Sequence, residues 1–321
     1  MLSRVAESVY WMSRLVERAE NVARFIGVNL NLSLDLPGSS GEGEQWHPLV
    51  VTSGDDDAFS QRFGVPTRRN VIRFLALDAE NPNSVRSCLA TARENARTVR
   101  ECISEEMWEH LNQFHLMVAE ACESRNGEGP VHEPQEFFEK VRQAGQQFLG
   151  VTDATMTHGE AWQFCRLGRS IERADKTTRI LDVKYYLLLP EPEDVGTPFD
   201  SLQWAALLRS AGALQMYRQK HGRITPRDVV DFLVLDLQFP RSVLSCLAQA
   251  DGALHAITGT PSGTFASAAE QRLGKLHAGL AFTRADEIVA GGMHEFLDST
   301  QRQLNQTGDA VFETFFAPQI S

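Results

Sequence analysis

The chain repeats part of its own sequence, and this repeat constrains the fold more than any other feature. Residues 46–92 align with residues 204–250 at a constant offset of 158 without a gap, and about 20 of these 47 positions are identical. The identity is densest where Phe74-Leu75-Ala76-Leu77-Asp78 aligns with Phe232-Leu233-Val234-Leu235-Asp236. Because self-similarity at a fixed offset marks a structural unit that is used more than once, the sequence predicts two related halves.

A second correspondence, at an offset of 155, lies upstream of the first. Arg14-Leu15-Val16-Glu17-Arg18-Ala19-Glu20 aligns with Arg169-Ser170-Ile171-Glu172-Arg173-Ala174-Asp175. The two offsets differ by three residues, which a short insertion explains, so we interpret the repeat as an internal duplication over most of the 321 residues. We expect one domain over 1–321 that is made of two repeats, 1–125 and 155–321, joined by a loop and a helix over 126–154.

Helical patterning dominates both repeats. Apolar residues recur at three- and four-residue spacing over 3–33, whereas alternating strand patterns are almost absent. The apolar runs Val71–Leu77 and Val229–Leu235 are interpreted as short buried helices, because Thr225-Pro226-Arg227-Asp228 is a helix start signal. We therefore predict an all-α helical bundle. The expected loops are 36–44, 125–134, 190–198 and 258–263.

The charge balance excludes several classes of protein. The chain has 31 Lys and Arg against 42 Asp and Glu, a net charge of −11. Proteins that bind nucleic acid or an anionic membrane surface need excess basic side chains, so we expect neither partner. No apolar run approaches the roughly 18–20 residues that span a bilayer, and the first residues do not resemble a signal peptide. Five cysteines without a closely spaced pair fit a reducing compartment, so we expect a cytoplasmic protein.

The duplicated helices carry a stripe of charged residues opposite their apolar face. At 100° per residue, the stripe of each helix falls within an arc of roughly 120°. Its members are Arg14, Glu17, Arg18, Asn21 and Arg24 in the first repeat and Arg169, Glu172, Arg173, Lys176 and Arg179 in the second. We also expect Glu20 to pair with Arg24, and Asp175 with Arg179, one helical turn apart. A solvated face explains one such stripe, but its retention in two copies favours a stripe that is buried between the repeats or lines a cleft.

Other polar residues differ between the two repeats. Asp78 and Asp236 stand where the paired apolar helices end. Beyond them the first repeat reads Arg93-Glu94-Asn95-Ala96-Arg97, and the aligned stretch Asp251-Gly252-Ala253-Leu254-His255 lacks this pattern. The asymmetry suggests that one repeat carries a site and that the other supports it.

These segments resemble the bacterial alpha-E family, which is named for its all-α fold and its acidic motif. The matching segments lie within residues 10–24, 77–85, 93–101, 106–112 and 168–182, in family order. The resemblance implies an association with circularly permuted ATP-grasp ligases, encoded beside or fused to this domain, and with transglutaminase-like proteins. The implied pathway makes or modifies amide bonds in peptides. The resemblance assigns no reaction to the alpha-E domain itself.

Three functions fit these residues. In the first, the chain is a helper or ligand-binding component of a peptide- or amide-ligase system, because guanidinium groups bind carboxylates through paired hydrogen bonds. In the second, it is an enzyme that modifies amides or peptides with Glu17 and Glu172 as general bases. In the third, it holds a carboxylate metal site. We favour the first and expect no metal, because Arg stands where such helical bundles place His.

The candidate ligand-binding residues are charged side chains from both repeats. They are Arg14, Glu17, Arg18, Glu20, Arg24, Asp78, Arg93, Glu94, Arg97, Arg169, Glu172, Arg173, Asp175, Arg179 and Asp236. We expect them to line a polar site between the repeats for a peptide or an acidic small molecule, with Glu17 and Glu172 near a shared axis. No cofactor is expected, because the chain lacks the phosphate loops GxxxxGKS/T and GxGxxG.

Overall fold

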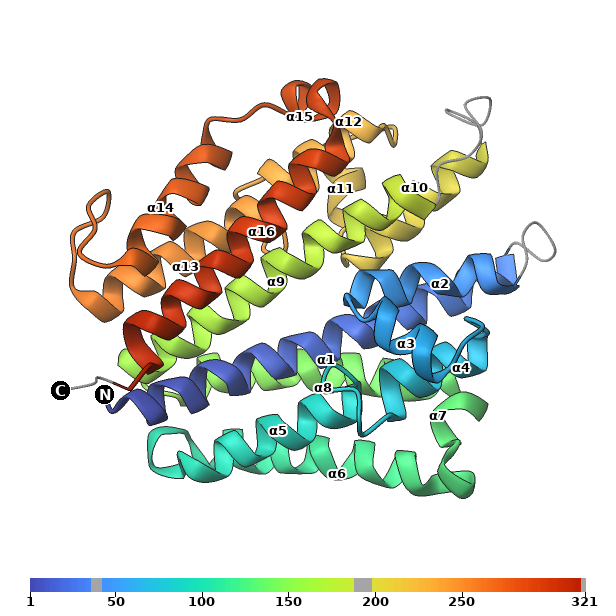
Figure 1. Ribbon diagram of the computed structural model, residues 1–321, viewed down its shortest axis with the longest axis horizontal. Helices are drawn as coiled ribbons and strands as arrows, with labels where there is room; N and C mark the ends of the chain where they lie inside the picture. The colour runs from blue at the N-terminus through green and yellow to red at the C-terminus, as the bar shows by residue number, and fades with distance from the viewer. Residues whose placement is uncertain (36–41, 188–197, 319–321) are drawn as a thin grey trace. The chain divides into compact units, whose positions relative to one another are not determined.

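The computed structural model describes residues 1–35, 42–187 and 198–318 (Figure 1). Every regular element in these ranges is helical, and none of the described residues lies in a β-strand, which confirms the all-α prediction. The chain divides into two compact units. The N-terminal unit is Trp11–His158, and the C-terminal unit combines Met1–Tyr10 with Gly159–Ser321. The repeat boundaries expected from the sequence stay a prediction.

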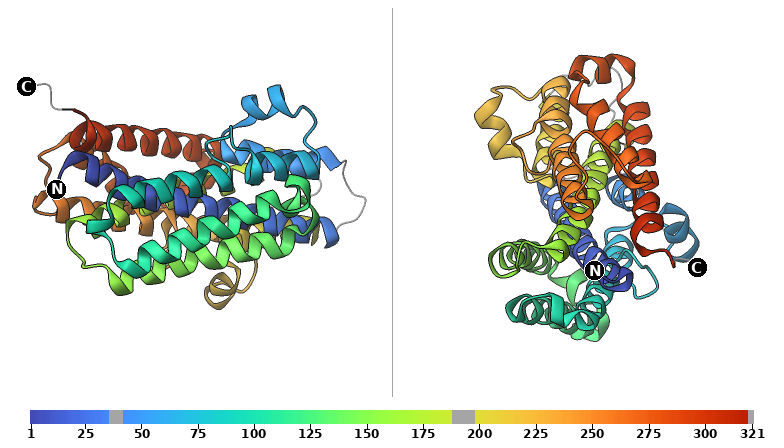
Figure 2. Two further views of the ribbon diagram at one scale, coloured as in Figure 1. Left: turned by 90° about the horizontal axis from the view of Figure 1, so that it is seen from below. Right: turned by 90° about the vertical axis from the view of Figure 1, so that its left-hand side faces the viewer.

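The N-terminal unit contains most of α1 (Ser3–Asp35) and the helices up to α8. These are α2 (Glu42–Ser53), α3 (Asp56–Arg62), α4 (Arg68–Ile72), α5 (Val85–Thr98), α6 (Glu105–Gly127), α7 (Gly129–His132) and α8 (Pro134–Thr155). A π-helical turn, η1 (Arg73–Leu77), follows α4, and a 3-10 turn, η2 (Arg100–Cys102), follows α5. Helix α6 packs against α5 and α8, and the three run side by side in Figures 1 and 2.

The C-terminal unit contains the first turns of α1 and the helices from α9 onward. These are α9 (Glu160–Leu187), α10 (Pro198–Ser210), α11 (Leu214–Lys220), α12 (Pro226–Val230), α13 (Val243–Thr258), α14 (Ala268–Ala281), α15 (Ala285–Gly291) and α16 (Met293–Val311). Two π-helical turns, η4 (Asp231–Leu235) and η5 (Phe312–Phe316), follow α12 and α16. Helix α9 packs against α13 and α16, and α14 packs against the same two helices (Figure 1).

No helix in the described ranges combines the length and the apolarity that crossing a membrane requires.

From Thr67 onward, the first repeated segment folds into a short α-helix, a π-helical turn and a capped helix. Thr67 begins α4 by accepting a hydrogen bond from the backbone N–H of Asn70. The π-helical turn η1 ends before Asp78, where the backbone becomes extended. Ser84 then begins α5 by accepting from the backbone N–H of Ser87 at 3.1 Å. These side-chain caps satisfy donors that the helix itself cannot pair.

The aligned segment of the C-terminal unit repeats this local structure. Thr225 accepts from the N–H of Asp228 at the start of α12, which confirms the predicted start signal. The π-helical turn η4 ends before Asp236, and Ser242 begins α13 by accepting from the N–H of Ser245 at 3.1 Å. The predicted short buried helices are therefore confirmed, and the structure adds their π-helical ends. A π-helical turn leaves no simple trace in apolar periodicity, because it widens the helix by one residue only.

The loop predicted over 125–134 is wrong. Helix α6 continues to Gly127, α7 occupies Gly129–His132 and α8 begins at Pro134. Pro130 and Pro134 lie in the first turns of these helices, where the missing N–H of proline costs nothing, so they start helices instead of breaking one. The loop predicted over 258–263 is confirmed, because α13 ends at Thr258 and Gly259 follows with a positive φ of 74°.

Two further predicted loops fall largely on residues that the structure does not describe. Residues 188–197 lie outside the described ranges, and Pro198 is the first residue of α10. Of the loop expected over 36–44, residues 36–41 lie outside the described ranges and 42–44 belong to α2.

Helix α8 approaches α1 closely within the N-terminal unit. A Cβ atom added at Gly145 would lie 2.8 Å from both Cβ and Cγ of Glu20, which is closer than packed atoms tolerate. A Cβ atom added at Gly150, on the same helix, would have no atom within 4 Å. The two glycines therefore provide a matched test of the α1–α8 contact.

We predict that Gly145→Ala lowers the free energy of unfolding by about 1–3 kcal/mol through overpacking against Glu20. Gly150→Ala should raise it by roughly 0.5–1 kcal/mol, because alanine favours a helix over glycine. Urea denaturation of both variants measures the difference. Equal stabilisation by the two substitutions would show that α8 does not approach α1 at this point.

Candidate functional site

The charged stripe of α1 is an array of hydrogen-bonded and ion-paired side chains in the N-terminal unit. Glu17 is buried and accepts a hydrogen bond from Nδ2 of Asn21 at 3.0 Å. One turn on, Glu20 and Arg24 form the predicted ion pair, and both side chains are buried. Arg18 is half-buried and donates to Oδ1 of Asn83 at 2.5 Å. The acids of this array therefore lie inside the protein with a donor beside each of them.

The stripe of α9 forms the corresponding array in the C-terminal unit. The side chain of Glu172 is 0% exposed, and Nζ of Lys176 lies 3.7 Å from its Oε1. The same ammonium lies 3.3 Å from Oδ2 of Asp175. Arg179 also binds Asp175, with Nε 2.9 Å from Oδ2, which confirms the predicted pair. Arg173 is buried as well, while Arg169 is half-buried.

The two arrays match position by position at the offset of 155. Glu17 and Asn21 correspond to Glu172 and Lys176, so a neutral amide in one array stands where an ammonium stands in the other. The pairs Glu20–Arg24 and Asp175–Arg179 correspond as well. Glu17 belongs to the N-terminal unit and Glu172 to the C-terminal unit, so the expected proximity of these two carboxylates stays a prediction.

The cations of α9 keep Asp175 ionised. Burial of this carboxyl group acts to raise its pKa, but the adjacent charges of Lys176 and Arg179 outweigh that effect, and the pKa lies below its ordinary value. The arrangement favours carboxylates that accept hydrogen bonds and orient cations over carboxyl groups that donate a proton.

Asp78 and Asp236 hold the chain where the π-helical turns end. Asp78 pairs with Arg62 at 2.6 Å, and Asp236 pairs with Nζ of Lys220 at 2.6 Å. Asp236 also accepts two backbone N–H groups, from Gln238 and Phe239. Burial acts to raise the pKa of Asp236, but Lys220 and these N–H groups lower it overall. Both aspartates thus have a sufficient local role, and their expected ligand-binding role stays a prediction.

Arg93, Glu94 and Arg97 lie on α5, where both arginines contact Glu94. Nη1 of Arg93 lies 3.1 Å from Oε1 of Glu94, and Nε of Arg97 lies 2.8 Å from its Oε2. These two cations lower the pKa of Glu94, with the hydrogen bond from Arg97 as the largest contribution. Glu94 and Arg97 are exposed, at 52% and 59% of their side-chain surface, so this cluster faces solvent.

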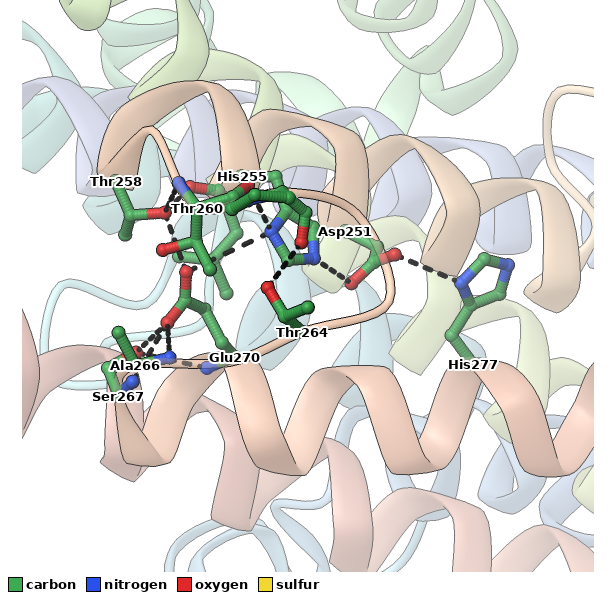
Figure 3. A network of polar contacts seen from close by, with 11 residues as sticks. Asp251, His255, Thr258, Thr260, Thr264, Ala266, Ser267, Glu270 and His277 are labelled. Carbon is green, nitrogen blue, oxygen red and sulfur yellow. Dashed lines mark hydrogen bonds and ion pairs between the residues drawn. The ribbon is translucent and has the colours of Figure 1, made fainter.

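A polar network in the C-terminal unit was not expected from the sequence (Figure 3). Asp251 on α13 lies between two histidines: its Oδ1 is 3.6 Å from Nε2 of His255, and its Oδ2 is 3.3 Å from Nδ1 of His277 on α14. On its other side, His255 contacts the backbone oxygen of Thr260 at 3.0 Å. The stretch from Asp251 therefore lacks the arginine pattern but carries a different set of polar contacts.

Glu270 closes this network at the start of α14. Its Oε1 accepts from the hydroxyl of Thr258 at 2.6 Å, and its Oε2 accepts from the backbone N–H groups of Ala266 and Ser267. Burial acts to raise the pKa of Glu270, but these hydrogen bonds outweigh it and lower the pKa to about 2. The loop between α13 and α14 is thereby fastened to both helices. No group of three or more His, Cys, Asp or Glu within the described ranges is arranged to hold a metal ion.

The comparison with known families matches this architecture. A model described as a predicted alpha-helical domain with a conserved ER motif covers residues 1–316. The chain belongs to the Alpha-E family. Glu-Arg pairs stand in this Alpha-E chain at Glu17-Arg18 on α1 and at Glu172-Arg173 on α9, within the two arrays.

The Alpha-E chain is similar to several longer mycobacterial proteins. The uncharacterized proteins Mb2597 of Mycobacterium bovis and MT2643 of Mycobacterium tuberculosis are each 22% identical to it over 335 residues. A third, Rv2567 of Mycobacterium tuberculosis, is 21% identical. These alignments cover 98% of the chain but 37% of each relative, so the chain spans little more than a third of their length. No solved structure matches it.

Sequence reasoning missed two sets of residues in this Alpha-E chain. Trp108 and Asn112 of α6 contact Arg93. Both lie in the segment 106–112 that carries the family resemblance, but they are not among the candidate ligand-binding residues. In the polar network, Ser267 and Glu270 do carry a signal, since Ser-x-x-Glu is a capping box and the structure contains one here. This signal could have located the start of α14, although not the contact with Thr258.

Lys176 tests how strongly the α9 array depends on its cations. We predict that Lys176→Met lowers the free energy of unfolding by about 3 kcal/mol, because it leaves buried carboxylates with one cation fewer. Lys176→Asn should cost at least about 1 kcal/mol less, because an amide can donate to Glu172 as Asn21 does to Glu17. Urea denaturation measures both.

A matched control exists on α8, where Lys140 pairs with Glu136 at the same spacing but on the surface. Lys140→Met should change stability by less than about 0.5 kcal/mol. The interpretation of α9 as a buried array fails if Lys176→Met and Lys140→Met have equal effects.

Glu270 makes the stability of the C-terminal unit depend on pH. Because its pKa is lowered from 4.5 to about 2, its contribution is present above about pH 4.5 and is lost as the pH falls toward 2. We predict that Glu270→Gln lowers the free energy of unfolding by roughly 2 kcal/mol at neutral pH and by progressively less in acid. Denaturation at several pH values checks this.

The exposed Glu136 provides the control for this measurement. Glu136→Gln should have little effect at any pH, since exposed ion pairs contribute little. A difference between Glu270→Gln and the unmodified chain that stays constant from neutral to acid pH would refute the assignment.

Proposed function

We propose that the chain is a helper component of an amide- or peptide-ligase system, and that arginines of α1 and α9 hold an acidic or peptidic ligand. The observation that carries the proposal is the repeated array of carboxylate and cation one helical turn apart, with its acids buried. Keeping charged groups inside a protein is costly, and a purely structural contact could be apolar at lower cost. A charged array that is present in two helices therefore supports a role in recognition.

The buried and the half-buried members of the arrays have different roles in this proposal. The acids Glu20 and Asp175 are inside the protein, where each binds an arginine one helical turn away. The half-buried arginines are the groups that a ligand can reach, and they are Arg14, Arg18, Arg169 and Arg179. A guanidinium group binds a carboxylate through two parallel hydrogen bonds when its orientation is fixed. The arrays therefore suit a ligand that carries carboxylates.

The charge count of each array also supports an acidic ligand. On α1, three cations (Arg14, Arg18 and Arg24) accompany two acids (Glu17 and Glu20). On α9, four cations (Arg169, Arg173, Lys176 and Arg179) accompany two acids (Glu172 and Asp175). Although the chain as a whole carries a charge of −11, the residues of each array carry more positive than negative charges.

We also infer that the two arrays arose by internal duplication. The sequence alignment supports this, and so do the shared local contacts of the aligned segments. In both segments, a cysteine lies near the backbone oxygen of a proline six residues earlier: Cys88 with Pro82 at 3.6 Å, and Cys246 with Pro240 at 3.5 Å. Both segments also pair the aspartate after the π-helical turn with a cation 16 residues earlier.

The partner in this proposal is a circularly permuted ATP-grasp protein, with a transglutaminase-like protein as a further component. The resemblance of the chain to alpha-E sequences associated with such proteins supports this choice. The similar mycobacterial proteins extend well beyond the region that they share with this chain, which is compatible with an alpha-E region that works beside other domains.

An independent enzyme is less well supported. Glu172 has no exposed side-chain surface, and the ammonium of Lys176 lies beside it, so a substrate cannot reach this carboxylate without a rearrangement of α9. The same ammonium would repel a divalent metal ion from Glu172. The helper role needs no such rearrangement, because the half-buried arginines would contact the ligand.

The helper role predicts the effect of removing reachable arginines. In the chain that carries Arg18→Gln and Arg179→Gln, we expect the yield of amide product in the presence of the ATP-grasp partner to fall by about tenfold, since a charge-assisted pair is worth about 1.5–3 kcal/mol. Co-purification of the partner should fall as well. Product formation and pull-down are measured with the same preparations.

Arg142→Gln is the control, because Arg142 on α8 is partly exposed and pairs locally with Glu139. It should leave both readouts unchanged. The proposed role is lost if the double variant folds, as judged by its thermal unfolding, and still supports full product yield and co-purification.

A further inference from the structure

A second arginine cluster lies on the surface of the N-terminal unit, where α5, η2 and α6 meet. Its members come from two helices and the turn between them, and we call them the α5–α6 cluster: Arg93, Glu94, Arg97, Arg100, Trp108 and Asn112. All of them lie in one compact unit, so their mutual geometry belongs to that unit alone.

Contacts within the cluster hold its guanidinium groups in place. Nε of Arg93 donates to Oδ1 of Asn112 at 2.7 Å. The guanidinium carbons of Arg93 and Arg100 lie 5.5 Å and 4.9 Å from the centre of the Trp108 ring, within the range of a cation–π interaction. These contacts limit the rotamers of the arginines before a ligand binds. The arginine side chains therefore lose less entropy when a ligand binds.

The cluster has more cations than its own acid can neutralise. Glu94 is shared between Arg93 and Arg97. Arg100 is exposed, and no carboxylate of the described residues lies within 4 Å of it. The terminal nitrogens of Arg97 likewise make no hydrogen bond to any described residue. Two guanidinium groups therefore present donors to solvent on a surface that also carries an indole ring.

The aligned positions of the C-terminal unit have partners within that unit. At the offset of 158, Arg93, Arg97 and Arg100 correspond to Asp251, His255 and Thr258. These three residues belong to the network of Figure 3, in which α14 and the loop before it supply their partners. The C-terminal unit thus supplies internal partners to these three positions, whereas the N-terminal unit leaves cationic donors on its surface. An internal structural role accounts for the first set and not for the second.

We propose that the α5–α6 cluster is a docking surface for a short acidic segment of a partner protein. Fixed guanidinium forks match carboxylates, and a tryptophan beside them supplies the apolar contact that is common in protein interfaces. Exposed Glu101 and Glu105 stand next to the cluster in sequence, so the basic area is small. A small basic area suits a segment with a few carboxylates and does not suit a long polyanion such as nucleic acid.

The acidity of the rest of the chain makes this docking specific. A net charge of −11 disfavours an acidic segment over the chain as a whole, whereas the three arginines of the cluster accompany one acid of the cluster, Glu94. Complementary charge of this kind sets where a partner docks and how fast it associates. The inference extends the helper role proposed above, but it rests on α5 and α6 and leaves the α1 and α9 arrays untouched.

A binding measurement with simple peptides tests the proposal. Fluorescence anisotropy of a short labelled oligoglutamate peptide is recorded at about 50 mM salt with the full chain, with oligoglutamine as the uncharged probe. We expect oligoglutamate to bind and oligoglutamine not to bind. Arg97→Gln combined with Arg100→Gln should raise Kd by about tenfold or more.

Arg86→Gln is the matched control, because Arg86 is an exposed arginine on the same helix and its loss changes the net charge in the same direction. It should change Kd by less than about twofold. The proposal is overturned if the unmodified chain does not bind oligoglutamate, if the double variant binds as tightly as the unmodified chain, or if Arg86→Gln weakens binding as much per charge removed.

The two proposals fail separately. If the α5–α6 variant loses peptide binding while the Arg18 and Arg179 variant retains full product yield, the docking surface stands and the role of the α1 and α9 arrays falls. If the reverse is found, the arrays stand and the docking surface falls. Thermal unfolding of both variants confirms that each chain is folded before it is compared.

Discussion

The need to keep a partner beside each buried carboxylate shapes both long helices of this chain. Glu20 on α1 and Glu172 and Asp175 on α9 lie inside the protein, each beside a cation one turn away or next to it in sequence. An isolated buried carboxylate would be unstable, and removal of one member of a buried pair typically costs about 3–5 kcal/mol. The helices must therefore stay regular through these turns, because the pairs exist only at helical spacing.

The same constraint connects packing to the proposed function. Gly145 lets α8 approach the backbone of α1 at Glu20, so the acid is covered and Arg24 is held beside it. Covered acids cannot serve a ligand directly, but they fix the directions of the cations. Half-buried arginines of the same helices, such as Arg18 and Arg179, are the groups that can contact a ligand. Preorganised cations bind carboxylates more tightly than mobile ones, because less entropy is lost.

Local patterns made much of this structure predictable. The extent of α1, the pairs Glu20–Arg24 and Asp175–Arg179, and the start of α12 at Thr225 all follow from interactions within a few residues, and the structure confirms them. The residues that sequence reasoning missed depend on contacts across the chain. Trp108 meets Arg93 through the packing of α5 on α6, and Glu270 meets Thr258 through closure of a loop. Neither contact has a period or a spacing that a sequence can reveal.

The proposed function is that the chain assists an amide ligase. Amide formation by the purified ATP-grasp partner, measured with increasing amounts of the chain and for the chain by itself, tests this most directly. We expect no turnover by the chain alone and a ligase rate that rises to saturation as the chain is added. Turnover of a peptide or an amide by the isolated chain, or a ligase rate that does not change when the chain is added, would rule out the helper role.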